Sequence, residues 1–242
     1  MTLRTNLALI IASSLLGGIY FCVVLPLGGL LMTERGVPLW QIGVLGGIPW
    51  AATLAVTLLM PGLLQRFSPR LLYVLARWFG FIAAVIFVGS NNLVLWALGY
   101  LLLGLSGGMA WVIGDALLAT LPPPGQRAKV MSFYMFILNF NIILGPLLVA
   151  VIGTGNLAFI LGLLIMLLNL LMGYLVRFPA AEDKKKGAAG FSLLVQIGLP
   201  IAGLLLVALS SGSFEGSSIK MLPVQAFSLG YSERLGALAA VA

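Results

Sequence analysis

The sequence predicts an all-α polytopic membrane protein, built as a bundle of spanning helices. Of its 242 residues, 61% are hydrophobic and only 8% are charged, whereas a soluble domain carries about 25% charged residues. The mean hydropathy is +1.15, and the apolar residues form long runs separated by short polar segments. Because hydrocarbon offers the backbone no hydrogen-bonding partner, each long run must form a helix that crosses the membrane.

Six apolar runs precede the first long polar segment of the chain. The first run follows Arg4 and is longer than the roughly 7–15 residues of a signal-peptide core, so it predicts a spanning helix rather than a cleaved leader. The other runs also reach the length of about 20 residues that a span requires. We therefore expect spanning helices at 7–32, 39–64, 71–89, 93–121, 130–152 and 157–177.

Turn-forming and polar residues separate these helices. The segment 33–38 carries glycine and proline and ends the first helix, while the polar segments 65–70 and 90–92 end the second and third. Three consecutive prolines at 122–124 close the fourth helix, and the glycines of 153–156 form a tight turn before the sixth. Glycine and proline are the strongest punctuation of regular structure, so these breaks fix the order of the helices.

A longer polar segment follows the sixth helix and divides the chain. The next apolar run, from about 191 to 227, exceeds one span, so the seventh helix is tilted, broken or extends beyond the membrane. An eighth begins near Leu235 and is incomplete at Ala242. We expect a truncated bundle of about seven spans and a partial eighth. Its parts are a six-helix bundle at 1–177, a basic cytoplasmic linker at 178–190 and the start of a second bundle at 191–242.

Basic residues gather on one side of the expected membrane. The opposite side carries Arg35 and Arg234, each beside a glutamate. Because cytoplasmic loops are enriched in lysine and arginine, we expect a multi-pass protein of the plasma (inner) membrane with a cytoplasmic N-terminus. The basic residues on the cytoplasmic side are Arg4, Arg66, Arg70, Arg127, Lys129, Arg177, Lys184, Lys185 and Lys186.

Several other classes of function are excluded. The formal charge of +7 does not indicate nucleic-acid binding, because the basic residues lie at helix ends rather than on one face. The chain has no histidine and one cysteine, Cys22, which excludes an intrachain disulfide and metal sites built from histidine or cysteine clusters. It contains no nucleophile–base pair or phosphate-binding loop. We expect no enzyme, cofactor or metal, and the lipid bilayer and a small solute as partners.

The topology and three motifs resemble the major facilitator superfamily of secondary transporters. The segment 61–70 is similar to the family's G-x-L-a-D-R-x-G-R-R motif and matches it at Leu63, Arg66 and Arg70. Among its departures, Gln65 replaces the aspartate of the family's usual gating ion pair. The other two motifs are the glycine-rich stretch 104–108 and the dipeptide Gly145-Pro146.

The resemblance covers the whole chain and implies about six-tenths of a twelve-helix transporter. It implies transport of a small solute by alternating access, with a proton or sodium ion as co-substrate. One alternative is a truncated, non-transporting remnant or subunit, which would need a missing C-terminal half to move against. Another is efflux of amphipathic compounds, which the Gly145-Pro146 dipeptide favours.

We expect a buried ion pair between the third and fourth helices. Arg77 and Asp115 lie at about the same depth, roughly 10 Å from the cytoplasmic surface at 1.5 Å per residue. Charges inside a bilayer are costly and commonly functional, and the resemblance implies a role at a cytoplasmic gate. Arg66 and Arg70 are alternative partners for Asp115. The pair could instead only pin the two helices together, or Asp115 could contact substrate or a proton.

The seventh predicted helix carries the expected coupling acid, Glu215. Lys220 lies five residues later, so the two side chains point in different directions on an ideal helix. We expect Glu215 to face a central cavity as a proton or cation site. The alternative is that this part of the helix rises into water and that Lys220 extends toward the membrane surface.

Four more residues are candidates for the substrate pathway. Asn139 and Asn141 are two residues apart in the fifth helix, so at most one of them faces a central cavity. Hydrogen bonding between helices is the alternative role for these amides. Trp111 and Tyr134 are candidates for contact with an aromatic or amphipathic substrate, with simple packing as the alternative.

Overall fold

The computed structural model describes residues 2–179, 222–227, 229–232 and 235. Six long α-helices dominate this part of the chain, and each is long and apolar enough to cross a membrane. The predicted class, a helical membrane bundle, is therefore confirmed. The elements are α1 (Leu3–Glu34), α2 (Leu39–Arg66), α3 (Pro69–Gly89), α4 (Leu93–Thr120), the 3-10 turn η1 (Pro124–Gln126), α5 (Arg127–Ile152) and α6 (Asn156–Leu175).

The helix ends follow local side-chain chemistry as well as hydropathy. Ser68 caps α3 by accepting a hydrogen bond from the Leu71 backbone N–H at 3.2 Å, and Asn92 caps α4 in the same way through the Val94 N–H at 2.8 Å. Gly153 ends α5 with a φ of 84°, which favours glycine. Helices α1, α3 and α5 begin earlier than hydropathy predicts, because each starts with polar residues that hydropathy counts as loop.

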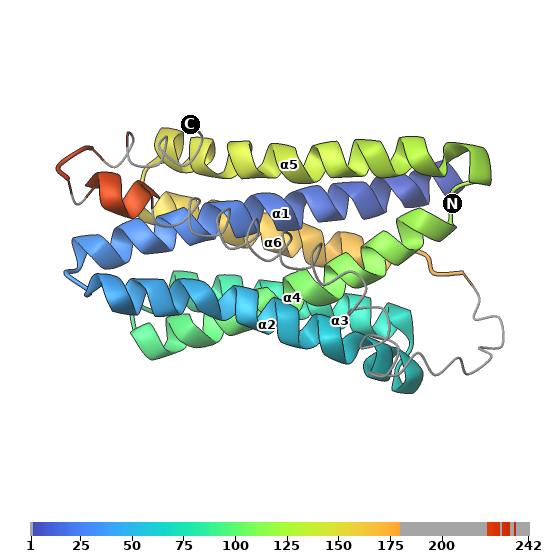
Figure 1. Cartoon of the computed structure of the whole chain (residues 1–242), viewed down its shortest axis with the longest axis horizontal. Coiled ribbons are helices and arrows are strands. Elements are labelled where there is room, and N and C mark those ends of the chain that lie inside the picture. Colours follow the sequence, from blue (N-terminus) through green and yellow to red (C-terminus); the bar gives the residue numbers. More distant parts are fainter. Residues whose placement is uncertain (1, 180–221, 228, 233–234, 236–242) are drawn as a thin grey trace, which may run out of the picture.

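All connections between the six helices are short, so successive helices run in opposite directions (Figure 1). The starts of α1, α3 and α5 and the ends of α2, α4 and α6 therefore lie at one end of the bundle. We call this the basic end. It is defined by Arg4, Arg66, Arg70, Arg127, Lys129 and Arg177. In the described part of the chain, the opposite end carries Arg35 beside Glu34.

Helix α1 lies at the centre of the packing. It contacts α5 and α6 most extensively and also touches α4 and α2, while α4 packs on α2 and α3. Every residue from 19 to 30 is buried, so this stretch of α1 is covered on all sides. Helix α3 packs on α4 and α6.

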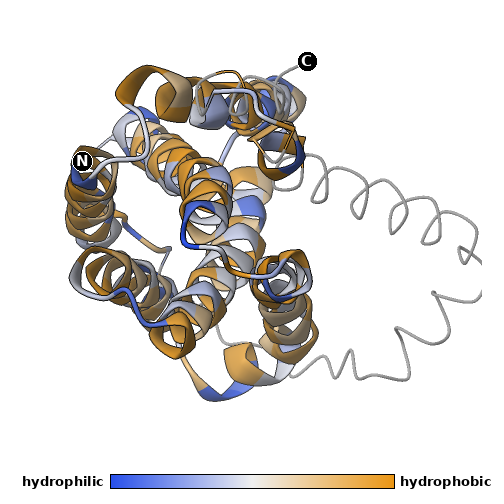
Figure 2. Ribbon diagram, turned by 90° about the vertical axis from the view of Figure 1, so that its left-hand side faces the viewer, coloured by the Kyte–Doolittle hydropathy of each residue, from blue (hydrophilic) through white to orange (hydrophobic). Residues whose placement is uncertain are grey.

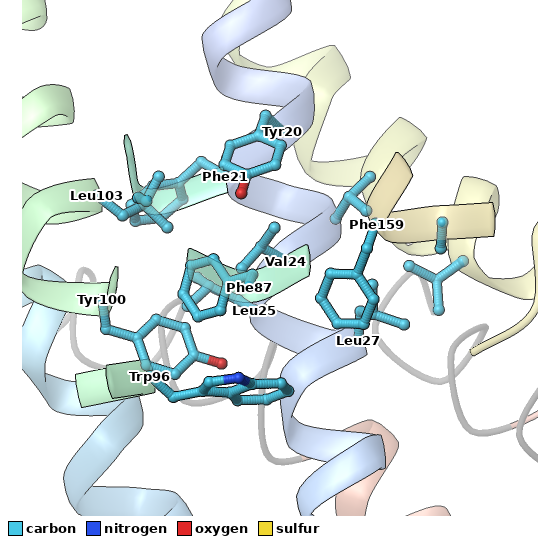
Figure 3. Packing of buried hydrophobic residues seen from close by; sticks show 14 of the residues in the cluster. Tyr20, Phe21, Val24, Leu25, Leu27, Phe87, Trp96, Tyr100, Leu103 and Phe159 are labelled. Atoms are coloured by element: carbon cyan, nitrogen blue, oxygen red, sulfur yellow. The ribbon is translucent and has the colours of Figure 1, made fainter. Parts of the chain in front are cut away.

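Aromatic rings fill the space near the end opposite the basic end (Figure 3). Phe87 of α3 makes edge-on contacts with Trp96 and Tyr100 of α4, at centroid distances of 5.5 Å and 5.0 Å. Trp96 also contacts Phe159 of α6 at 6.0 Å, and its indole N–H donates to the Ser90 carbonyl at 2.6 Å. Large rings supply the van der Waals contact that holds helices together in lipid.

The outer surface of the bundle is apolar. Leu59 of α2, Phe136 of α5 and Leu164 of α6 are more than half exposed, and hydrophobic residues, drawn in orange, predominate along the helices (Figure 2). Such continuous exposure is a liability in water but matches a hydrocarbon surround. The protein is therefore an integral, multi-pass membrane protein.

Two helix pairs approach each other closely at glycines. A Cβ atom at Gly104 of α4 would lie 2.7 Å from the Cα of Pro49 in α2, and one at Gly145 of α5 would lie 2.6 Å from the carbonyl carbon of Cys22 in α1. Gly107, one turn from Gly104 on α4, would meet no atom within 4 Å. Backbone-to-backbone contact of this kind requires glycine.

Gly104→Ala should destabilise the bundle by about 1–3 kcal/mol, since the new methyl group pushes α2 and α4 apart. Gly107→Ala is the matched control, because alanine raises helix propensity equally at both positions while the methyl group at 107 meets open space. Thermal unfolding of the purified protein in detergent compares the two variants. Equal stabilities would contradict the close approach at Gly104.

Candidate functional site

Two charged side chains lie more than a turn from any helix end in the six described helices. They are Arg77 in α3 and Asp115 in α4. Charged residues within membrane spans are rare, face the interior of a bundle and mark ion or substrate pathways. The candidate site is therefore built around these two residues.

Arg77 is buried between α3, α1 and α6, with 3% of its surface exposed. Its guanidinium carbon lies 4.3 Å from the centre of the Tyr73 ring. Gly17 of α1 and Gly173 of α6 leave room for the side chain, because Cβ atoms there would lie 3.5 Å from Nη1 and 2.7 Å from Cγ. The nitrogens Nε and Nη2 are buried without a hydrogen-bond partner.

A short polar chain lies beside Arg77. The Ser13 hydroxyl of α1 donates to Oδ1 of Asn169 in α6 at 2.5 Å, and the Tyr73 hydroxyl of α3 lies 3.4 Å from the Ser13 oxygen. All three side chains have no exposed surface. This chain of polar groups was not predicted from the sequence, although one signal was available: Asn169 stands alone as a polar residue within the apolar run of α6.

A small cavity of about 30 Å³ lies where α1, α3, α4 and α6 meet, enough for about one water molecule. Its polar wall consists of Arg77, Asn169, Ser106 and Ser14, and Trp111 forms part of the apolar wall. The wall of the cavity therefore includes Trp111, which was predicted to lie in the substrate pathway, and Arg77, which was predicted to lie at a cytoplasmic gate.

Asp115 belongs to a second cluster, formed by α4, α5 and α1. The Tyr134 hydroxyl lies next to the Asp115 carboxylate and the Ser14 hydroxyl. Neither contact meets hydrogen-bond geometry, so the Tyr134 hydroxyl and Oδ1 of Asp115 are buried without a partner. The Ser14 hydroxyl donates instead to the Ile10 carbonyl at 3.0 Å. Asp115 as a whole is half-buried.

The expected ion pair between Arg77 and Asp115 is not formed. Within residues 2–179, Arg77 lies on Tyr73 and against α6, while Asp115 lies beside Tyr134 of α5. The prediction rested on equal depth along the helix axes, which says nothing about the direction in which each side chain leaves its helix. Depth was a sound guide to burial and a poor guide to pairing.

Arg66 and Arg70, the alternative partners, are exposed at the basic end. Arg70 borders an open cavity of about 480 Å³, together with Tyr174 and Arg177. Neither arginine belongs to the two buried clusters. Glu215 and Lys220 lie outside the described residues.

The two asparagines of α5 differ sharply. Asn141 is 1% exposed and packs against Gly18 of α1, where a Cβ atom would lie 3.0 Å from the amide carbon. Both polar atoms of its amide are buried without a partner. Asn139 is exposed, and its amide donates to the Met135 carbonyl of its own helix at 2.8 Å. The buried, unpaired amide is thus at Asn141, beside the glycines that border the small cavity.

Comparison with known proteins now places this arrangement in a family. The profile of the Major Facilitator Superfamily matches residues 7–242. A comparison with curated protein sequences found no match. Two similar solved structures are a D-xylose–proton symporter, with a TM-score of 0.71 and 17% identity, and a bacterial homologue of the human lysosomal transporter Spinster in an inward-facing and unoccupied conformation, with a TM-score of 0.72 and 16% identity.

These alignments establish the fold and its extent. They cover 99% of this chain but only 65% of the symporter and 58% of the Spinster homologue. The chain therefore spans about six-tenths of the length of the two transporters.

Asn141→Ala should cost less stability than Asn169→Ala, by about 1–2 kcal/mol. Both substitutions remove the same atoms from a buried site, but only Asn169 accepts a hydrogen bond, and its loss leaves the Ser13 hydroxyl proton without an acceptor. Chemical denaturation in mixed micelles measures the difference. Equal losses would mean that the Asn141 amide has a structural partner.

Proposed function

Because the chain belongs to the major facilitator superfamily over residues 7–242, we propose that it is part of a secondary transporter that moves a small solute by alternating access. One observation carries the proposal: Arg77 and Asp115 are held between helices without an ionic partner in the described part of the chain. Burying unpaired polar groups costs several kcal/mol. A scaffold gains nothing from that cost, whereas a transporter needs groups that its solute or coupling ion can satisfy.

Alternating access requires a second bundle that moves against the first. We propose that residues 191–242 begin this second bundle and that 178–190 link the two. The coverage of 65% and 58% of the two similar transporters supports an assembly larger than six helices. A non-transporting remnant or subunit is disfavoured, since it has no use for the two unpaired charges.

We propose a proton as the coupling ion and Asp115 as the group that carries it. A half-buried carboxylate with an unpaired oxygen can release and accept a proton, and the neighbouring Tyr134 hydroxyl can hydrogen-bond to the ionised form. Sodium is a less suitable coupling ion than a proton, because it would need several oxygen ligands at once. One similar structure is that of a proton symporter, which supports the choice. Glu215, selected from the sequence, is a second candidate for the coupling acid, with Lys220 near it in sequence.

We propose that the basic end faces the cytoplasm and that the protein lies in the plasma (inner) membrane. Six basic residues define that end, whereas the opposite end carries Arg35 beside Glu34 in the part of the chain that the structure describes. This asymmetry is the one that the positive-inside rule requires. Arg66 and Arg70, exposed there, remain candidates for contacts that open and close the cytoplasmic side.

Asp115→Asn should abolish proton coupling while leaving the protein folded, because asparagine keeps the size of the side chain and cannot ionise. The whole protein is reconstituted in liposomes with a trapped pH-sensitive dye and exposed to a panel of solutes: D-xylose, acetate, lactate and ethidium. A solute that drives proton flux identifies the transport class, and the initial rate should fall at least about tenfold in the variant, a change of about 1.4 kcal/mol.

Glu34→Gln is the matched control. Glu34 is the last residue of α1 and lies at the end of the bundle opposite the basic end, far from Asp115. Glu215→Gln is measured in parallel to decide between the two acids. Full proton coupling in Asp115→Asn would contradict the assignment. Outward movement of ethidium would favour efflux of amphipathic compounds over uptake of a nutrient.

A further inference from the structure

We propose that Arg77, Asn169 and Ser106 form a binding site for a small anionic group, and that the group is a carboxylate on the transported solute. The assignment of the carboxylate to a transported solute rests on the proposed transport function. The anion-binding site itself depends only on the geometry around the cavity of about 30 Å³.

The first step is the charge. Arg77 is 97% covered by protein, and arginine remains protonated in proteins. Its contact with the Tyr73 ring is a cation–π interaction, which stabilises the charge by less than the cost of removing a cation from water. No carboxylate in the described part of the chain pairs with it. Neutralising the positive charge of Arg77 therefore requires an anion that the described residues do not supply.

The guanidinium of Arg77 has donors that no protein group accepts. The unpaired nitrogens Nε and Nη2 form one edge of the guanidinium, along which two N–H bonds point the same way. This edge matches the two oxygens of a carboxylate in a bidentate pair. The third nitrogen, Nη1, lies beside Gly17, 3.5 Å from a Cβ atom placed there, and Gly17 borders the cavity. An anion in the cavity therefore meets the guanidinium of Arg77, which has two further donors without a partner.

The third step is the chemistry of the surrounding groups. Ser13 donates to Oδ1 of Asn169, which turns the amide nitrogen of Asn169 toward Gly17, 3.1 Å from a Cβ atom placed there. Gly17 and Asn169 both border the cavity, and the Ser106 hydroxyl borders it from α4. One N–H of this amide donates to the Met166 sulfur at 4.0 Å, which leaves the other for a ligand. The polar groups at the cavity are therefore a guanidinium, an amide N–H and a hydroxyl, with no acidic residue in the wall. Such a set selects for negative charge.

The fourth step is size. A volume of about 30 Å³ corresponds to one water molecule, so a single carboxylate or a halide ion fits better than a phosphate or sulfate. Trp111 and Phe21 contribute apolar wall beside this polar pocket, and their rings are 6.2 Å apart. This arrangement suits a solute whose charged group enters the polar pocket while its carbon skeleton lies against the aromatic rings.

The test measures equilibrium binding and does not depend on transport. The whole protein is purified in detergent, and its thermal unfolding midpoint is followed against sodium acetate, with sodium chloride as a second probe, at ionic strength held constant with sodium sulfate. A ligand that binds the folded state raises the midpoint in a saturable way.

Wild type and Arg4→Gln should respond alike, because Arg4 is exposed at the basic end. Arg77→Gln should bind acetate at least about tenfold more weakly, the effect of losing a charge-assisted pair.

Asn169→Asp keeps the test decisive if Arg77→Gln fails to fold. Aspartate has the same shape, can still accept from Ser13, and places a carboxylate beside Arg77, so it acts as an internal anion. We expect this variant to be at least as stable as wild type without acetate and to lose its response to acetate. Two results would overturn the site. One is an acetate response that is unchanged in Asn169→Asp. The other is the absence of a response in wild type at acetate concentrations up to about 1000-fold above a micromolar protein concentration.

The remaining outcomes separate the proposals. A response to chloride equal to that for acetate would overturn the carboxylate assignment and leave a site for a small inorganic anion. Acetate binding that depends on Arg77, without any solute-driven proton flux in liposomes, would refute the proposed transport and leave the anion site intact. Proton-coupled flux of a solute, together with acetate binding that is the same in wild type and Arg77→Gln, would refute this inference and leave the transport proposal intact.

Discussion

Within a bilayer, no water is available to satisfy a polar group, and this constraint shapes the whole chain. The backbone meets it by forming six long helices. Side chains meet it in different ways: Ser14 and Asn139 donate to carbonyls one turn earlier in their own helices, and Ser13 with Asn169 bridges α1 and α6. Against this background, the groups that remain unpaired stand out. Within the residues that the structure describes, these groups include side-chain atoms of Arg77, Asp115, Tyr134, Asn141 and Tyr20.

Helix α1 connects almost all of these groups. Ser13, Ser14, Gly17 and Gly18 lie within two turns of the helix. They contact or border Asn169, Tyr134, Arg77 and Asn141, respectively. Small residues at these positions allow the long side chains of other helices to reach the centre. The same stretch thus joins a cationic cluster on the α3 and α6 side to an acidic cluster on the α4 and α5 side. A shift of α1 would alter both clusters together.

Hydropathy alone was sufficient to predict the six helices, because the length of a span and the turn residues between spans are local properties of the sequence. Burial of Arg77 and Asp115 also followed from their depth in the predicted helices. Their partners did not, since contact depends on how each helix is rotated, which the nearly uniform apolar runs of α1 and α4 do not encode. The chain from Tyr73 through Ser13 to Asn169 was missed for the same reason: each residue is unremarkable in its own helix, and only packing brings the three together.

The separation of Arg77 from Asp115 has a consequence for the charge that crosses the membrane. Were the two paired, each would neutralise the other and neither would attract a mobile ion. Held apart, with Tyr73 beside one and Tyr134 beside the other, the two can take the separate roles proposed above, the arginine toward an anion and the aspartate toward a proton. A carboxylate and a proton that move together carry no net charge, so their passage would not work against or draw upon the membrane potential, which acts with about 2.3 kcal/mol per elementary charge per 100 mV. Coupling would then depend on the pH gradient alone, and α1 is the element through which occupancy of one cluster can bias the other.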